Sequence, residues 1–129
     1  MIKDYKDLIV WQKALDVISE IIDLINLLPS GPVTEIISKQ IISSSTSVSA
    51  NIAEGHSSGS SKEFNRILKI AYREAKETDN WLQVIKKVKK YNKINILNAV
   101  DKIESDNLVV TKMIAGLRKK IDEILQKGK

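Results

Sequence analysis

The sequence predicts an all-α fold, an antiparallel up-down-up-down bundle of four helices. Apolar residues recur at spacings of three and four in four long segments, which is the period of an amphipathic helix. The breaks between these segments are short and rich in Pro, Gly, Ser and Asn, and none shows the alternation of a strand. Short connections make consecutive helices antiparallel neighbours. We therefore expect one domain, residues 1–129, with helices over about 7–28, 34–56, 61–89 and 93–126.

Composition limits the class of protein. Hydrophobic residues make up 43% of the chain and charged residues 29%, which is typical of a globular domain. The absence of cysteine excludes disulfides and thiolate metal sites and favours a reducing cytoplasm. The first segment has charges inside its apolar run, unlike a signal peptide, and no run approaches the roughly 18 apolar residues of a membrane span. We expect a cytoplasmic protein with no membrane partner.

The first predicted helix has more apolar surface than one bundle seam requires. A second apolar row runs beside the first, so either this helix is central in the core or its second row meets another subunit. Asp4 or Asp7 can cap its start, and Pro29 ends it. One row is Leu8, Trp11, Leu15, Ile18, Ile22 and Ile25, and the other is Val10, Ala14, Val17, Ile21, Leu24 and Leu28.

The second predicted helix contains the run Ser43 to Ser47, which propensity alone would assign to a linker. We predict a helix because the apolar spacing continues through Ile37, Ile41, Val48 and Ile52, with no Gly or Pro between them. Small side chains also allow a neighbouring helix to approach closely. Gly55 is the expected C-cap, followed by a loop that includes His56.

The third and fourth predicted helices have simpler patterns. Ser60 and Glu63 fit a capping box at the start of the third helix, and a lysine cluster at 86–90 suits its C-terminal dipole. Asn92 can cap the fourth helix, and Gly128 ends it. The expected core row of the third helix is Phe64, Leu68, Ala71, Ala75, Thr78, Leu82 and Ile85. The apolar positions of the fourth helix include Leu97, Val100, Ile103, Leu108, Thr111, Ile114, Leu117, Ile121 and Ile124.

Charge is distributed unevenly along the chain. Net charge is +5, but residues 1–60 hold four basic and seven acidic side chains, whereas residues 61–129 hold seventeen basic and nine acidic ones. A basic half favours an anionic partner such as nucleic acid, although a solvated lysine-rich surface is the alternative. The bundle topology brings the end of the fourth helix beside the start of the third. The candidate phosphate-binding residues are therefore Lys62, Arg66, Lys69, Arg73, Arg118, Lys119 and Lys120.

No pattern of catalytic or metal-binding residues emerges. The one histidine, His56, has no cysteine partner, and Glu54 and Glu77 lack the Glu-x-x-His pairs of a dimetal bundle. Nucleophile elbows and glycine-rich phosphate loops are absent from the sequence. We expect a protein that is not an enzyme, with no catalytic residue, metal or cofactor.

Several short motifs of the sequence together resemble the pattern of a known family. They are Asp7-Leu8-Ile9-Val10-Trp11-Gln12-Lys13-Ala14, Pro29, Glu35, Gln40-Ile41, Ser47-Val48, Asn51-Ile52-Ala53-Glu54-Gly55, Lys62-Glu63-Phe64, Ile70-Ala71 and Glu77. In order and spacing they resemble the proteins encoded within intervening sequences of bacterial 23S ribosomal RNA genes, over nearly the whole chain. The chain is also similar to accessory variability proteins of diversity-generating retroelements.

The resemblance implies an antiparallel bundle that assembles into a ring-like homopentamer, whose relatives engage a reverse transcriptase and nucleic acid. It does not imply a settled biochemical role. The signature residues are interpreted as mainly structural: Gln40, Ser47, Asn51, Glu54, Gly55, Phe64 and Glu77.

The chain departs from the family pattern at three places. It has Ile42-Ser43 where the family usually has a basic pair, Arg73-Glu74-Ala75 where small residues are commoner, and a different loop at 30–33. The missing basic pair moves any nucleic-acid contact to the third and fourth helices.

Two functional hypotheses follow from the sequence. The first is a non-enzymatic oligomer that binds structured RNA or another nucleic acid through its basic residues. The alternative is an interaction or scaffold module that binds a partner protein, with the charge serving solubility.

Overall fold

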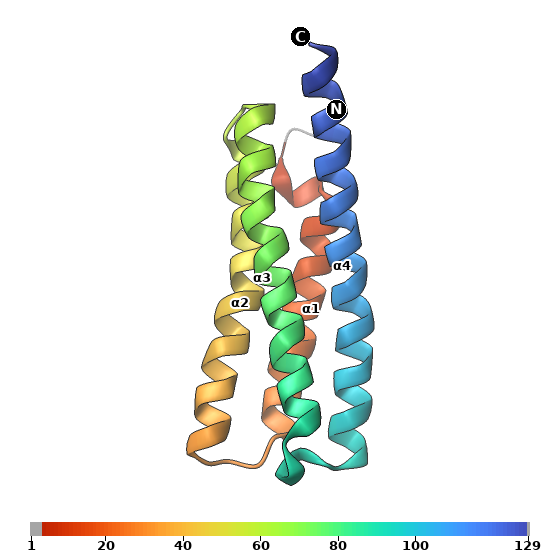
Figure 1. The fold of residues 1–129 in the computed structure, drawn as a ribbon. Coiled ribbons are helices and arrows are strands. Elements are labelled where there is room, and N and C mark those ends of the chain that lie inside the picture. The colour runs from red at the N-terminus through yellow and green to blue at the C-terminus, as the bar shows by residue number, and fades with distance from the viewer. Residues whose placement is uncertain (1–3, 129) are drawn as a thin grey trace.

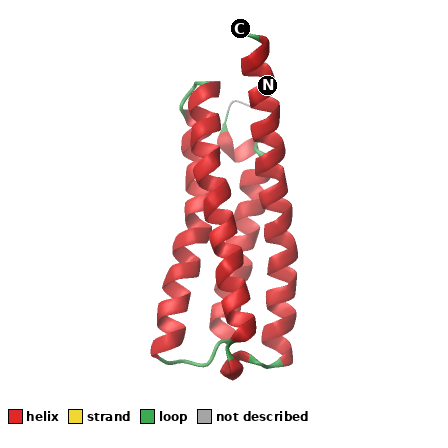
Figure 2. Cartoon of the chain, viewed as in Figure 1, coloured by secondary structure: helices red, strands yellow, loops and turns green. Residues whose placement is uncertain are grey.

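The computed structural model describes residues 4–128, which form four α-helices and two short 3-10 helices (Figures 1 and 2). Helices adjacent in the chain pack against each other, and α1 also packs against α4, which closes an up-down-up-down bundle. This arrangement confirms the predicted fold class. The helices are α1 (Ile9–Leu27), α2 (Pro32–Ser57), α3 (Ser61–Lys87) and α4 (Ile94–Lys127), and the 3-10 helices are Tyr5–Asp7 and Lys89–Tyr91.

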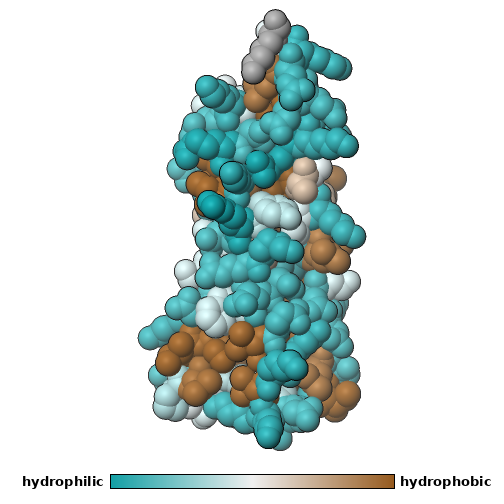
Figure 3. Space-filling view, in the orientation of Figure 1, coloured by the Kyte–Doolittle hydropathy of each residue, from teal (hydrophilic) through white to brown (hydrophobic). Residues whose placement is uncertain are grey.

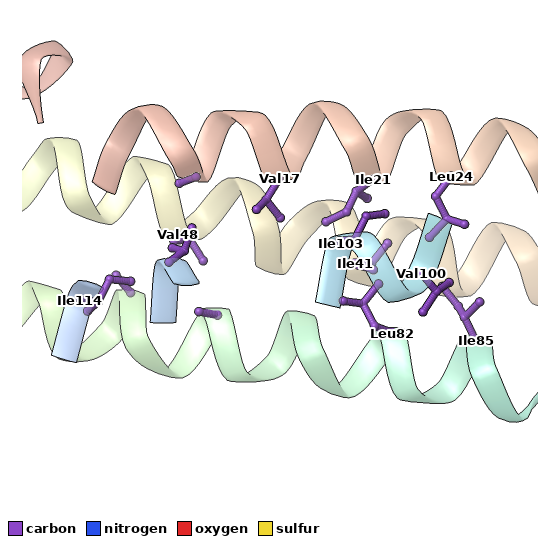
Figure 4. Close-up of a cluster of buried hydrophobic side chains, with 14 of the residues drawn as sticks. Val17, Ile21, Leu24, Ile41, Val48, Leu82, Ile85, Val100, Ile103 and Ile114 are labelled. Carbon is purple, nitrogen blue, oxygen red and sulfur yellow. The ribbon is translucent and has the colours of Figure 1, made fainter. Parts of the chain in front are cut away.

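The core runs along the bundle axis and receives side chains from all four helices (Figure 4). Isoleucine, leucine and valine dominate it, and most of these side chains have almost no exposed surface. Burying such a side chain contributes roughly 1.5–3 kcal/mol, so this row is the main source of stability. Its members include Val17, Ile21, Leu24, Ile41, Val48, Leu82, Ile85, Val100, Ile103 and Ile114.

The serine run of α2 is helical, as predicted. Its hydroxyls bond to backbone carbonyls one turn earlier, Ser45 to Ile42 at 3.3 Å for example, so they do not divert the backbone from the helix. The Oγ of Ser44 lies 2.8 Å from Oγ1 of Thr78 on α3, and both residues are buried. Small residues here let α2 and α3 approach closely.

Two predictions about the ends of α2 are wrong. The helix begins at Pro32, because proline fits the first turn of a helix, where its missing N–H has no partner to lose. It also continues past Gly55 to Ser57, so Gly55 is not a C-cap. Gly55 instead gives α3 room, because a Cβ built there would lie 2.9 Å from Cδ1 of Phe64. His56 is helical and half-buried, with its ring edge-on to Phe64 at 5.7 Å, rather than solvated in a loop.

The predicted N-cap is confirmed for α3 but not for α1 or α4. Ser60 caps α3 and accepts a hydrogen bond from the backbone N–H of Glu63 at 3.2 Å, as predicted. Asp4 caps the first 3-10 helix rather than α1, which begins after Leu8. Lys93 rather than Asn92 occupies the N-cap of α4. These shifts move the helix ends by one or two residues, within the usual uncertainty of such boundaries.

Helix α1 uses its two apolar rows differently. The row from Val10 to Leu28 is buried, whereas the neighbouring row is only partly covered, with Leu15 39% and Ile22 48% exposed. The partly covered row, which we call the α1 ridge, consists of Trp11, Leu15, Ile18, Ile22 and Ile25. Helix α1 is therefore not central in the core of the single chain.

Within residues 4–128, no helix has the combination of length and apolar character needed to cross a membrane.

Candidate nucleic-acid interface

The start of α3 and the end of α4 meet at one contact. Nδ2 of Asn65 donates to Oδ1 of Asp122 at 2.5 Å, and this hydrogen bond fixes the two helices side by side. Lys62 and Lys69 lie one turn before and after Asn65, and Lys119 lies one turn before Asp122. All three lysines are exposed. The topology thus gathers candidate residues from two helices around one seam, at the upper end of the bundle in Figure 1.

The α3 residues form one exposed row. Lys62, Arg66, Lys69 and Arg73 are spaced by four, three and four, which keeps them on one face of the helix, and all are exposed. Arg66 is held by Glu63 on the same helix, with Nη2 to Oε1 at 2.5 Å. This bond lowers the pKa of Glu63 and raises that of Arg66. Part of the charge of Arg66 is therefore neutralised.

The three α4 bases do not share one face. Arg118 is half-buried, and its Nε is enclosed without a hydrogen-bond partner among the described residues. Lys119 and Lys120 are exposed, but successive residues lie about 100° apart around a helix. Lys119 faces the seam with α3, whereas Lys120 points toward the α1 side. Of the α4 residues, Lys119 and the inner Arg118 belong with the α3 row.

Two further lysines extend this surface. Lys76 lies two turns after Lys69, and Lys112 lies two turns before Lys119, and both are exposed. A spacing of seven keeps each pair on one helix face. Sequence reasoning missed them because it ended the α3 row at Arg73, although Lys76 continues the same spacing, and because it took the α4 residues from the cluster at 118–120. We call Lys62, Arg66, Lys69, Arg73, Lys76, Lys112, Arg118 and Lys119 the basic face.

The residues of the family signature occupy different environments. Gly55 is buried against Phe64, and Asn51 donates from Nδ2 to the carbonyl of Ser47 at 2.7 Å and to its Oγ at 3.0 Å. These four residues have local packing or hydrogen-bonding roles. The other three, Gln40, Glu54 and Glu77, are exposed.

A charged cluster joins α1 to α4 away from the basic face. Nζ of Lys102 lies 2.7 Å from Oε2 of Glu20 and 2.7 Å from Oδ2 of Asp106, beside a groove of about 510 Å³. Burial raises the pKa of Glu20, whereas the hydrogen bond from Lys102 lowers that of Asp106. Among residues 4–128, no group of three or more His, Cys, Asp or Glu side chains is arranged to hold a metal ion. The cluster links two helices through a lysine.

These features define a class of protein, an antiparallel four-helix bundle with a basic face on its third and fourth helices. The chain belongs to the 23S rRNA-intervening sequence protein family, whose model matches residues 6–116. It is similar to a crystal structure of a protein of unknown function from the S23 ribosomal protein family of Bacteroides thetaiotaomicron VPI-5482. The two are 30% identical with a TM-score of 0.72, and the match covers 86% of this chain and 99% of the other. No curated protein matches the sequence.

Proposed function

We infer that this protein is a non-enzymatic, RNA-binding bundle that contacts phosphates through its basic face. The observation that supports this function is the gathering of exposed lysines around the Asn65–Asp122 contact, from two helices far apart in sequence. Lysine and arginine in such an array neutralise backbone phosphates and release counterions. The family name, 23S rRNA-intervening sequence protein, agrees with a nucleic-acid context.

Recognition on this face should depend on shape and charge rather than on bases. The chain has six aromatic residues apart from histidine, and Phe64, Tyr72 and Trp81 of α3 pack against the core. Few aromatic rings are therefore free to stack on unpaired bases. Contacts to phosphates position a nucleic acid without reading its sequence. We expect structured RNA to bind with weak sequence preference.

Arg118 has a special place in this proposal. Its Nε is enclosed and lacks an acceptor within the described residues, which is costly for a charged donor. This enclosed nitrogen is out of reach of a ligand, but Arg118 is only half-buried, and guanidinium groups bind phosphates with directed hydrogen bonds through their terminal nitrogens. Arg118 should thus give an oriented contact, while the lysines supply general attraction.

The proposal is tested by the salt dependence of binding to a fluorescently labelled RNA hairpin, measured by anisotropy. Each phosphate neutralised contributes about 0.7–0.9 to the slope of log K against log salt. The triple variant Lys62→Gln/Lys69→Gln/Lys119→Gln should lower the slope by roughly two. The matched control is Lys89→Gln/Lys90→Gln/Lys93→Gln at the opposite end, which should leave it unchanged. A flat salt response of the wild type, or equal losses in both variants, contradicts the proposal.

A second candidate function, a self-associating scaffold, is supported by the exposed apolar residues. Ile22 and Val33 are each 48% exposed and Ile36 is 62% exposed, although they lie on helices whose other faces build the core. Contiguous exposed apolar surface on a globular protein commonly marks a contact site. We include a homo-oligomer, with five copies as the expected number, in the proposed function. A partner protein could then dock on the assembly whether or not RNA binds.

A further inference from the structure

The two chain connections at the lower end of the bundle in Figure 1 lie against each other. One is the loop between α1 and α2, and the other joins α3 to α4. They are so close that a Cβ built on Gly31 would lie 3.4 Å from Nζ of Lys90. Residues 27–36 and 87–94 therefore form a single surface, which we call the lower tip.

The lower tip has an excess of positive charge. Its four lysines are all exposed, and Glu35 is the one acidic residue in the two ranges. No ion pair within residues 4–128 involves these lysines, whereas Lys86, immediately before the tip, is paired with Asp101 and Glu104. Such a surface attracts an anionic partner. The four lysines are Lys87, Lys89, Lys90 and Lys93.

One of these lysines occupies a position that is unfavourable for folding. Lys93 is the N-cap of α4, and the first turn of that helix has no acidic residue. The N-terminus of a helix carries a partial positive charge, so a lysine there is destabilising. Ser, Thr, Asp or Asn would cap the helix better. Folding alone thus does not explain Lys93, whereas an anionic partner at the lower tip does.

Exposed aliphatic side chains border the lysines. Leu27, Val33 and Ile94 are 43%, 48% and 75% exposed, and they come from the end of α1 and the starts of α2 and α4. Figure 3 shows hydrophobic residues gathered toward the lower end, beneath a mostly hydrophilic upper half. The α2–α3 connection at the other end, residues 58–60, is Ser-Gly-Ser and has neither charge nor aliphatic side chains. A helix connection in this bundle therefore does not require either feature.

The combination of lysines with aliphatic side chains selects the kind of partner. RNA phosphates attract lysines but leave aliphatic groups in water. The surface of an anionic lipid bilayer suits both, because its phosphates attract lysines and its headgroup region takes up apolar side chains. We propose that the lower tip binds the surface of an anionic bilayer, with its aliphatic side chains at the boundary between headgroups and acyl chains.

This contact is distinct from a membrane span and from RNA binding. We expect no membrane partner from the sequence because it has no spanning segment, but binding at the bilayer surface needs none, so the lower tip changes that expectation. The lower tip and the Asn65–Asp122 contact lie at opposite ends of the bundle. A bilayer at the lower tip therefore leaves the proposed RNA contacts at the upper end open.

Co-sedimentation with vesicles tests the role of the lysines. Vesicles of phosphatidylglycerol and phosphatidylcholine in equal amounts should bind the protein, and vesicles of phosphatidylcholine alone should bind it far more weakly. Lys89→Gln/Lys90→Gln/Lys93→Gln should weaken binding roughly 100-fold, at about fivefold for each lysine. The triple glutamine variant of the basic face is the matched control and should bind the vesicles nearly as the wild type does.

A dye on a single cysteine tests insertion, because the chain has no native cysteine. An environment-sensitive dye on Ile94→Cys should shift its emission to the blue when anionic vesicles are added. The control is Ile124→Cys, 62% exposed near the opposite end, which should show no shift. Val33→Ser/Ile94→Ser should also weaken vesicle binding about tenfold with no change of charge, whereas Ile9→Ser/Ile124→Ser should not.

The outcomes separate this inference from the proposed function. Equal binding to the two kinds of vesicle, no binding to either, or equal dye shifts at the two positions would overturn it. It would also be overturned if the lower-tip lysine variant lost binding to the RNA hairpin but kept binding to vesicles. A dye shift at Ile94→Cys on raising the protein concentration alone would assign the tip to a second copy instead. None of these vesicle results bears on RNA binding by the basic face.

Discussion

The hydroxyl of Tyr91 lies 2.5 Å from Oγ1 of Thr34, although the two residues are far apart in sequence. Thr34 donates its only hydroxyl proton to the carbonyl of Pro29 at 2.6 Å, so Tyr91 must be the donor to Thr34. Tyr91 is completely buried. This chain of two hydrogen bonds ties the α3–α4 connection to the α1–α2 loop and closes the lower end of the bundle.

Tyr91→Phe should lower the free energy of unfolding by about 1–2 kcal/mol, because the ring stays in place but Thr34 loses its donor. Chemical denaturation monitored by circular dichroism measures the change. Thr34→Ser, which keeps the hydroxyl, is the control and should cost less. Equal stability of Tyr91→Phe and the wild type would contradict the role assigned to this hydrogen bond.

Substitution by alanine should change the stability of the fold in opposite directions at two helical glycines. Gly55→Ala places a Cβ 2.9 Å from Phe64 and 3.2 Å from Ile67, so it should destabilise the fold by about 1–3 kcal/mol. Gly116→Ala meets no heavy atom within 4 Å and should stabilise it by about 0.5–1 kcal/mol through helix propensity. Thermal unfolding of both variants checks the pair. If Gly55→Ala unfolded at the same temperature as the wild type, α2 and α3 would not be as close as described.

The contact of Glu104 with α3 predicts that the free energy of unfolding depends on pH. Gln83 and Lys86 donate to its carboxylate and lower its pKa below the ordinary value of 4.5. A lowered pKa in the folded state means that the unfolded state binds the proton more readily. The stabilising contribution is therefore present above about pH 4.5 and is lost as pH falls through the folded pKa.

Glu104→Gln tests this contribution. At pH 7 it should reduce stability by about 0.5 kcal/mol, since the pair is partly screened by solvent. The difference from the wild type should shrink as the pH falls well below about 4.5. Denaturation at several pH values measures this trend, and a difference independent of pH would contradict the assigned ion pair.

The fold was predictable because helical periodicity is local. The spacing of Ile37, Ile41, Val48 and Ile52 predicted a helix through the serine run, and the structure confirms it. The start of α2 was missed because proline was interpreted only as a breaker, although Pro32 fits a first turn.

The candidate site was only partly predictable. Spacing alone placed Lys62, Arg66, Lys69 and Arg73 on one face, but the rotation of α4 about its axis depends on tertiary packing. That rotation decides which residue turns inward, and here it is Arg118. The separation of Lys120 from Lys119 follows from helix geometry alone. Similarly, two apolar rows on α1 were visible in the sequence, but which row faces the core depends on the packing of α2 and α4 against it.

The most direct test of the proposed RNA-binding bundle is light scattering on the size-exclusion peak of the purified protein, with the 260/280 nm absorbance ratio recorded at low and high salt. We predict a mass that is a small multiple of 14.5 kDa, with a raised absorbance ratio at low salt that falls at high salt. A monomer with the absorbance ratio of free protein at both salt concentrations would contradict the account.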